Sequence, residues 1–405
     1  MPAPTWTVEA AWDDPIQGGS AAGFFKIGVS QIGGTDKIAG PLAFGTWTSV
    51  PEVKALRITR GANDDLTDLR AGECQLTLKD SAGKYNPLNT ASALNGKLNP
   101  MRPLRVKATH PLTLTEYHLF FGFITEIEHN PDPTVRESYI TAVDLFEWLA
   151  NSFPTVAALG STTVDAALRE ILVAVGWGSS TLRDLDAGRT MPDFSADATA
   201  TALSLIQDLM AVDRGLFFIA ADGKATYRSP ATLFKVGTAV ATYTQSLLGV
   251  VRPATQVRRI INKQVVTKTG NAAQTAENST SQQNYAVRVG SAITSAYLNN
   301  DAQADSLAKW IVGERKDPIK PARRITLSNK TDALLTEQLS RDLGALVTVT
   351  ENLGGTAVTG HIRGIEHETE QAGLALRTTF TVAEKSRTWF TIGSSKIDSA
   401  DVIGY

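Results

Sequence analysis

The 405-residue sequence predicts a mainly β protein, α+β overall, with two related β-barrel domains and a small helix-hairpin α+β domain between them. Short alternating apolar runs, broken by Gly, Pro, Asn and Asp, fill both ends of the chain and are typical of strands and turns. Helical spacing appears in the middle. The predicted domains are a first barrel over 1–150, the α+β domain over 151–235, a second barrel over 236–392 and a tail over 393–405.

The two barrels are predicted from a repeat. An octapeptide of the form G-x-I-x-x-I-E-H occurs at Gly122–His129 and again at Gly360–His367, 238 residues further on. We infer a duplicated domain, and we predict that the two terminal histidines, His129 and His367, occupy superposable positions on equivalent strands.

The surroundings of the octapeptide repeat in the same order. Leu76–Asp80 matches Ile325–Asn329 at an offset of 249 residues, and Leu104–Lys107 matches Leu346–Val349 at an offset of 242. Offsets that drift in this way indicate loops of unequal length between matching strands, because loops tolerate insertions better than paired strands do.

The first domain shows strand patterns with almost no helical signal, which favours a small barrel or sandwich. A turn is predicted at 80–84 from its composition, and 145–149 is expected to close the domain as a short helix or strand. The clearest strands are predicted over Val53–Arg60, Gly72–Lys79, Leu104–Ala108, Tyr117–Glu128 and Glu137–Val143.

The middle of the chain changes to helical spacing. Thr162 and Asp165 resemble a capping box for a helix that ends at Gly176, and Asp197 is placed to cap a second helix. A hairpin follows, with strands over 216–219 and 225–228. Its turn is Asp222-Gly223, since these residue types permit the positive φ of a two-residue turn.

Strand patterns return after residue 236. Val257–Thr267 and Asn284–Val289 are predicted strands, and the polar Gly270–Gln283 between them is predicted as a long hairpin loop. A helix is predicted over Asp301–Glu314. The final segment, Trp389–Tyr405, is polar and is expected to lie against a neighbour or to be poorly ordered.

Composition excludes some functions for the chain as a whole. The net charge of −2 gives no general case for binding nucleic acid or an anionic membrane. A single cysteine, Cys74, cannot form an internal disulfide and is predicted to be a buried thiol, which fits assembly in a reducing cytoplasm. We expect neither a secretion signal nor a membrane-spanning segment.

A search for chemistry finds no catalytic, cofactor-binding or metal-binding residues. No pair of the five histidines has the spacing of a helical zinc site, and no phosphate-binding loop or nucleophile elbow occurs. For His129 and His367 we favour a structural role at a strand end, with a metal ligand or general base as the alternative. The histidines are His110, His118, His129, His361 and His367.

The segment 315–324 carries five basic residues against one acidic residue. We interpret it as a solvated helix-to-strand linker, with an intersubunit or nucleic-acid-facing patch as the alternative. The seven tryptophans are scattered, so core packing is the expectation for most of them.

Several motifs in a fixed order resemble a known family. They comprise a strand ending in Lys-Asp, a Tyr-Asn-Pro-Leu-Asn-Thr turn, an Asn-Pro-Met-Arg-Pro-Leu-Arg entry and a Phe-Phe-Gly-Phe-Ile strand, and the hairpin 222–228 and the segment 360–367 match the rest. The succession resembles siphophage minor tail proteins of the baseplate-hub type, related to the central hub protein of contractile-phage baseplates. The residues that carry it are Arg60–Leu66, Ala71–Asp80, Tyr85–Thr90, Leu98–Val106 and Phe120–Ile124.

The resemblance implies a non-enzymatic structural hub with two tail-tube-like barrels, at the distal end of a virion tail and assembled in the host cytoplasm. It implies a homotrimer whose six barrels adapt a threefold tip to a hexameric tail tube. The implied partners are a distal tail protein or tail tube ring, a tape measure protein, and other tail tip or fibre proteins. Genomic DNA would pass transiently through the lumen, for which a weakly charged or acidic wall is expected.

Two other functions stay open from the residues. A tail-tip receptor-binding or cell-wall-saccharide-binding protein would need clustered surface aromatics. A wall-degrading enzyme would need a catalytic constellation, and no catalytic spacing in the sequence supports one.

Overall fold

The computed structural model describes residues 2–13, 46–61, 70–132, 134–234, 237–244, 260–318, 323–350, 357–370 and 373–384. The described chain is mainly β with several helices, so the predicted class is confirmed. The predicted tail, 393–405, lies outside the described residues, as does part of the basic segment.

The first β unit contains the predicted strands almost to the residue. Alternation of apolar and polar side chains in these strands buries one face, for example Leu76 and Leu78 on β4. The unit consists of β1 (Thr5–Ala10), β2 (Thr48–Ser49), β3 (Val53–Gly61), β4 (Glu73–Lys79), β5 (Pro103–Thr109), β6 (Glu116–His129) and β7 (Glu137–Val143).

The second β unit repeats the central strands of the first. It is composed of β15 (Ala241–Thr244), β19 (Arg323–Ser328), α7 (Asp332–Ser340), β20 (Leu346–Thr350), β21 (Ala357–Glu370) and β22 (Ala375–Glu384). Helix α7 was not predicted. Its Leu335 and Leu339 pack into the core of the first β unit, and its Leu334 packs against the core of the second.

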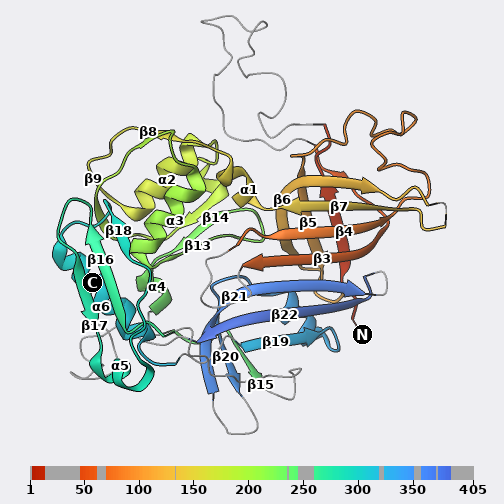
Figure 1. Ribbon diagram of the computed structural model, residues 1–405. Helices are drawn as coiled ribbons and strands as arrows, with labels where there is room; N and C mark the ends of the chain where they lie inside the picture. The colour runs from red at the N-terminus through yellow and green to blue at the C-terminus, as the bar shows by residue number, and fades with distance from the viewer. Residues whose placement is uncertain are drawn as a thin grey trace, which may run out of the picture.

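The two β units share one 12-stranded sheet, in which β3 of the first pairs with β21 of the second. Figure 1 shows the two strands side by side, with β4 and β7 beyond β3 and with β22 and β19 beyond β21. The sequence did not indicate this joint, because strand order depends on contacts between segments about 300 residues apart.

The middle α+β unit packs on β6. Its core of helix and hairpin side chains includes Phe121 and Phe123 of β6, whereas Phe120 and Ile124 enter the core of the first β unit. The unit contains α1 (Leu145–Ala150), β8 (Thr155–Val156), β9 (Ser161–Thr163), α2 (Val164–Ala174), η1 (Ser180–Leu182), β10 (Arg183–Leu185), β11 (Thr190–Asp193), β12 (Ala196–Asp197), α3 (Ala202–Asp213), β13 (Leu216–Ile219), β14 (Ala225–Arg228) and α4 (Pro230–Phe234).

Both predicted helices and the hairpin are present in this unit, but both predicted caps are wrong. Helix α2 has Thr163 at its N-cap position without a side-chain bond, and Asp165 accepts from the backbone N–H of Gly188 instead. Helix α3 is capped by Thr201, whose hydroxyl accepts from Ser204 N at 3.1 Å. Several residue types can cap a helix. The N-cap is the residue whose backbone is extended directly before the first helical turn, and this position is set by the fold.

A further group of elements lies within the range predicted as the second barrel. It has its own hydrophobic cluster, which also contains Val212 of α3. The prediction of a long loop over 270–283 is wrong, and so is the strand over 284–289, because β17 and α5 form there. The elements are β16 (Lys263–Lys268), β17 (Gln274–Glu277), α5 (Ser279–Tyr285), β18 (Ile293–Ser295) and α6 (Asp301–Arg315). The four predicted domain ranges stay a prediction.

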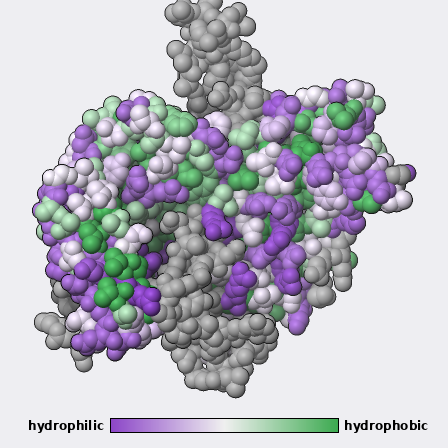
Figure 2. Space-filling model, in the orientation of Figure 1, coloured by the Kyte–Doolittle hydropathy of each residue, from purple (hydrophilic) through white to green (hydrophobic). Residues whose placement is uncertain are grey.

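Figure 2 shows a largely hydrophilic surface over the strands of the first β unit and a smaller hydrophobic patch over the group β16–α6 at the lower left. None of the helices in the described ranges is both long and apolar enough to span a membrane.

Candidate assembly interface

The two octapeptides occupy equivalent positions in the two β units. Gly122–His129 lies in β6 and pairs with β7, and Gly360–His367 lies in β21 and pairs with β22. Both pairings shift register at the same point, after the first isoleucine, between Ile124 and Glu126 and between Ile362 and Gly364. A bulge at the same letter of both copies supports a common origin of the two strands.

The glycine that opens each octapeptide is required by a close approach of the neighbouring strand. A Cβ on Gly122 would lie 2.4 Å from the carbonyl oxygen of Val143, and a Cβ on Gly360 would lie 2.1 Å from that of Ala383. Val143 and Ala383 are themselves equivalent, since they pair with the second residue of each copy. Both glycines therefore meet the same constraint.

The histidine that ends each octapeptide contacts a hydroxyl of the neighbouring strand. Nδ1 of His129 lies 2.9 Å from Oγ of Ser138, and Nδ1 of His367 lies 2.9 Å from Oγ1 of Thr378. In the register, Ser138 lies opposite His129 and Thr378 lies opposite His367, so the two histidines are equivalent. These contacts favour the structural role over a ligand or base.

The two histidines differ in burial. His367 is 1% exposed, and desolvation together with the nearby Arg60 guanidinium lowers its pKa to about 3. It is therefore neutral at physiological pH. His129 is half-buried, and its ring lies 3.4 Å from Oδ2 of Asp80.

The match of Leu76–Asp80 with Ile325–Asn329 agrees with the strand registers, because Leu76 pairs with Ile140 where Ile325 pairs with Phe380. The last residue of each stretch is buried, and its side chain forms hydrogen bonds with the backbone of neighbouring segments. Asp80 accepts from the N–H groups of Lys84 and Tyr85, and Asn329 donates to the carbonyl oxygens of Pro2 and Leu374.

The match of Leu104 with Leu346 is wrong by one residue. Leu104 pairs with Gly122, but the residue that pairs with Gly360 is Val347. A shift of one residue exchanges the two faces of a strand, and burial agrees with the corrected register because Leu104 and Val347 are both fully buried.

The joint between the β units lies directly after the bulge of β21. Its residues Gly364–Glu368 pair antiparallel with Gly61–Arg57 of β3. The Arg57 guanidinium donates to Oε1 of Glu366 at 2.6 Å, which raises the pKa of Arg57 above its ordinary value. Leu56 N donates to Oγ1 of Thr369 at 2.9 Å. The joint is thus made of backbone pairing with an ion pair on its exposed face.

A buried arginine ties three units together at the end of the joint. The Arg60 guanidinium donates to the carbonyl oxygen of Ile219 at 2.9 Å and to Oδ1 of Asp342 at 2.7 Å. Oδ2 of Asp342 accepts from the backbone N–H of Ala221. Arg60 comes from the first β unit, Ile219 from the middle unit and Asp342 from the second β unit. Nothing in the sequence pattern singled out this network, because its members are separated by up to 282 residues.

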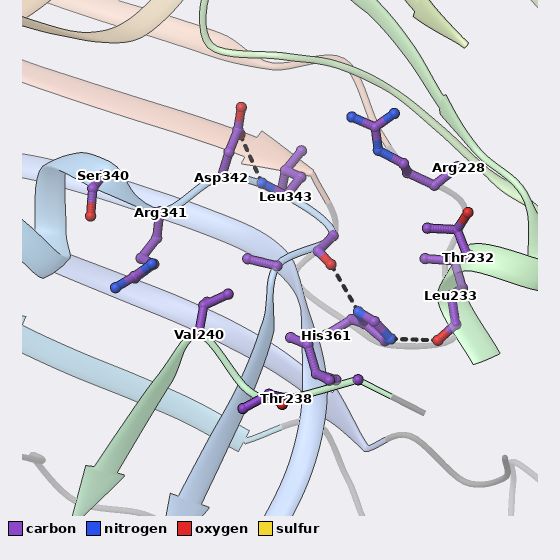
Figure 3. Close-up of a pocket in the computed structure, with 14 residues that line it drawn as sticks. Arg228, Thr232, Leu233, Thr238, Val240, Ser340, Arg341, Asp342, Leu343 and His361 are labelled. Atoms are coloured by element: carbon purple, nitrogen blue, oxygen red, sulfur yellow. Dashed lines mark hydrogen bonds between the residues drawn. The ribbon is translucent and has the colours of Figure 1, made fainter. Parts of the chain in front are cut away.

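A pocket of about 480 Å³ opens beside this network and is lined by α4, β14 and the turn before β20 (Figure 3). His361 lies in it with both ring nitrogens facing carbonyl oxygens, Nδ1 at 2.8 Å from Gly344 O and Nε2 at 2.9 Å from Leu233 O. The neighbouring Arg341 is paired with Glu337, and Arg228 with Asp184. Both arginines are thus paired within their own units, whereas the contact of His361 with Leu233 and the hydrogen bond from Ala221 N to Asp342 hold the middle unit to the second β unit.

The remaining residues considered for chemistry do not converge. Within the described ranges, no group of three or more His, Cys, Asp or Glu is placed to hold a metal ion. Cys74 is fully buried, which raises the pKa of its thiol. Trp12 and Trp177 are buried, and the indole N–H groups of Trp6, Trp148 and Trp177 donate to carbonyl oxygens, so these tryptophans serve packing.

No protein-family model matches the sequence, and no curated protein matches it. Solved structures with a similar fold include a tail protein from Neisseria meningitidis, with 11% identity and a TM-score of 0.58 over 83% of this chain and 93% of that one. The 43 kDa tail protein of prophage MuSo2 from Shewanella oneidensis has 12% identity and a TM-score of 0.56 over 84% and 94%. Prophage tail protein gp18 from Listeria monocytogenes has 11% identity and a TM-score of 0.50 over 84% and 92%.

These similarities cover more than four fifths of this chain and more than nine tenths of each of the other chains. The chain therefore has the fold of phage tail proteins, and the predicted resemblance is confirmed at the level of the fold.

Proposed function

We propose that this chain is a structural, non-enzymatic hub protein of a bacteriophage tail. In this proposal three copies form a ring at the tail tip. Each copy contributes its two β units, so the ring has six equivalent surfaces. The ring caps the hexameric tail tube and adapts it to the threefold tip.

The observation that carries the proposal is the equivalence of the two octapeptide strands. They share register, bulge, opening glycine and histidine–hydroxyl contact. A chain with two equivalent β units can satisfy sixfold contacts with three copies, because closed rings need the same surface to recur at each step. The fold shared with tail proteins supports a place in the virion tail.

The partners follow from this position. The ring would contact a distal tail protein or tail tube ring on one side, and other tail tip or fibre proteins on the other. A tape measure protein would end at its lumen, and genomic DNA would pass through transiently during infection.

Mass photometry of the purified chain tests the ring. A trimer of the 43.3 kDa chain gives a particle of about 130 kDa, and end-on views by electron microscopy are expected to show six densities of two alternating kinds. A monomer at all concentrations, or a ring of six chains, would contradict the proposal.

A further inference from the structure

The side of β6 that faces away from β7 is covered along only part of its length. Strand β5 pairs with it from Glu116 to Phe123, and Ile124 exchanges hydrogen bonds with Arg102 and Met101. From Thr125 to His129 no strand pairs with this side among the described residues, although β7 continues on the other side as far as His129. Exposed backbone groups of this kind are available for pairing with another strand.

The equivalent side of β21 shows the same change of neighbour, but there the edge is filled. Strand β20 pairs with β21 up to His361, and Ile362 exchanges hydrogen bonds with Ala345 and Gly344. After the bulge, β3 takes the place of β20 and pairs with Gly364–Glu368. In β21 the bulge therefore marks the point where β20 of the same β unit is replaced by β3 of the other, while β22 continues on the opposite side.

Comparison of the two octapeptides shows which contacts of β21 with β3 have no counterpart on β6 among the described residues. Ile127 and His129 correspond to Ile365 and His367, which lie opposite Arg60 and Ile58 of β3. Glu128 corresponds to Glu366, which is ion-paired with Arg57 across the joint. Glu128 is exposed, and no cation within the described part of the chain is placed to pair with it.

We propose that Thr125–His129 of β6, the open edge, accepts a strand from the second β unit of another copy, in the place that β3 holds on β21. The inference rests on the proposed ring and names the surface that joins its chains. A second copy is favoured as occupant because the same chain already fills the equivalent edge with its own strand. The incoming strand is expected to present a basic side chain to Glu128, as β3 presents Arg57 to Glu366.

The donor side of the second β unit follows from the same repeat. Strand β3 is bonded to β4 on the side away from β21, and β19 is the equivalent of β4. Strand β19 pairs with β22, and the described residues place no strand on its other side. Arg324 of β19 is exposed and adds a basic side chain to this strand. A closed ring needs an accepting edge and a donating edge on each chain, and in this proposal these sides of β6 and β19 supply them.

Hydrogen–deuterium exchange and a charge reversal test the inference. In the wild-type assembly the amides of Ile127 and His129 should be protected, and on dilution to monomer they should exchange at least about tenfold faster. Glu128→Arg should raise the concentration at which half of the assembly dissociates by roughly tenfold or more, because it places like charges opposite each other.

Glu116→Arg is the matched control. Glu116 lies on the same strand and is exposed, but β5 already covers its backbone, so this change should cost only its surface ion pair with Lys107 and leave assembly unchanged. A trimer that forms with Ile127 and His129 amides exchanging freely, and with full tolerance of Glu128→Arg, would overturn the inference and leave the proposed ring standing. A wild-type chain that stays monomeric would overturn both.

Discussion

The two repeated histidines make the same contact in different environments. His129 and His367 hold the same position against a hydroxyl, yet only His367 lies beneath the joint between the β units. Covering the strand with β3 buries the ring and brings Arg60 close, and both effects disfavour the imidazolium. The repeat in the sequence predicted that both positions hold histidine. The difference in their burial is seen only in the folded structure.

His367 is expected to make the protein sensitive to acid. Its folded-state pKa of about 3 lies below the 6.5 of a free histidine, so the unfolded chain binds the proton more tightly. The contribution to stability is complete above pH 6.5 and falls by up to about 1.4 kcal/mol per pH unit as the pH is lowered from 6.5 toward 3. Urea unfolding at pH 7 and pH 5 should show a weaker pH dependence in His367→Asn than in the wild type. His129→Asn is the control at the equivalent position, and an unchanged pH dependence in His367→Asn would contradict the assignment.

Strands and their pairing explain the remaining letters of the octapeptide. The first isoleucine is buried in each copy, as Ile124 and Ile362, and in both strands the pairing on one side ends at the bulge that follows; on β21 the strand β3 then continues it. The second letter has diverged, but Phe123 enters the core of the middle unit and His361 bonds to α4 of that unit. At this letter the residue type differs between the two copies, but both side chains contact the middle unit.

The opening glycines give a test of the equivalence between the strands. Gly122→Ala and Gly360→Ala each place a methyl group against a carbonyl oxygen of the neighbouring strand, which must move. Each change is expected to lower the free energy of unfolding by about 1–3 kcal/mol, measured by urea denaturation. Gly96→Ala is the control, since nothing lies within 4 Å of its Cβ and only the left-handed backbone at φ 75° is penalised, by about 1 kcal/mol. Tolerance of alanine at Gly122 or Gly360 would show that the two strands are not held as closely as the structure indicates.

At the scale of the molecule, the described residues form a sheet shared by two β units, a middle α+β unit attached to both, and the group β16–α6, whose hydrophobic cluster includes Val212 of α3. Phe121 and Phe123 attach this unit to the first β unit, and the hydrogen bonds of His361 and Asp342 attach it to the second. We expect these contacts to hold the two β units at a constant angle, which the proposed ring needs at every joint.

In the proposed function DNA passes through the ring, so the protein should not bind it tightly. With a net charge of −2 per chain, the assembled protein is expected to bind labelled duplex DNA negligibly at about 150 mM salt, because affinity for phosphates requires clustered Lys and Arg. Fluorescence anisotropy of a short duplex titrated with the assembled protein measures this. Micromolar binding that weakens steeply with salt would instead point to a basic nucleic-acid-facing patch, such as the one considered for residues 315–324.

The sequence was sufficient for the strands of the first β unit, the duplication and the resemblance to tail hubs, because alternation, turn composition and repeated motifs are local signals. It misplaced both helix caps, shifted one strand match by a residue, and showed a loop where β17 and α5 form. The pairing of β3 with β21, the burial of His367 and the Arg60 network arise from contacts between distant segments. Strand order and burial are set by packing of the whole chain, and among the described residues this packing places β3 against β21 but no strand at the equivalent edge of β6.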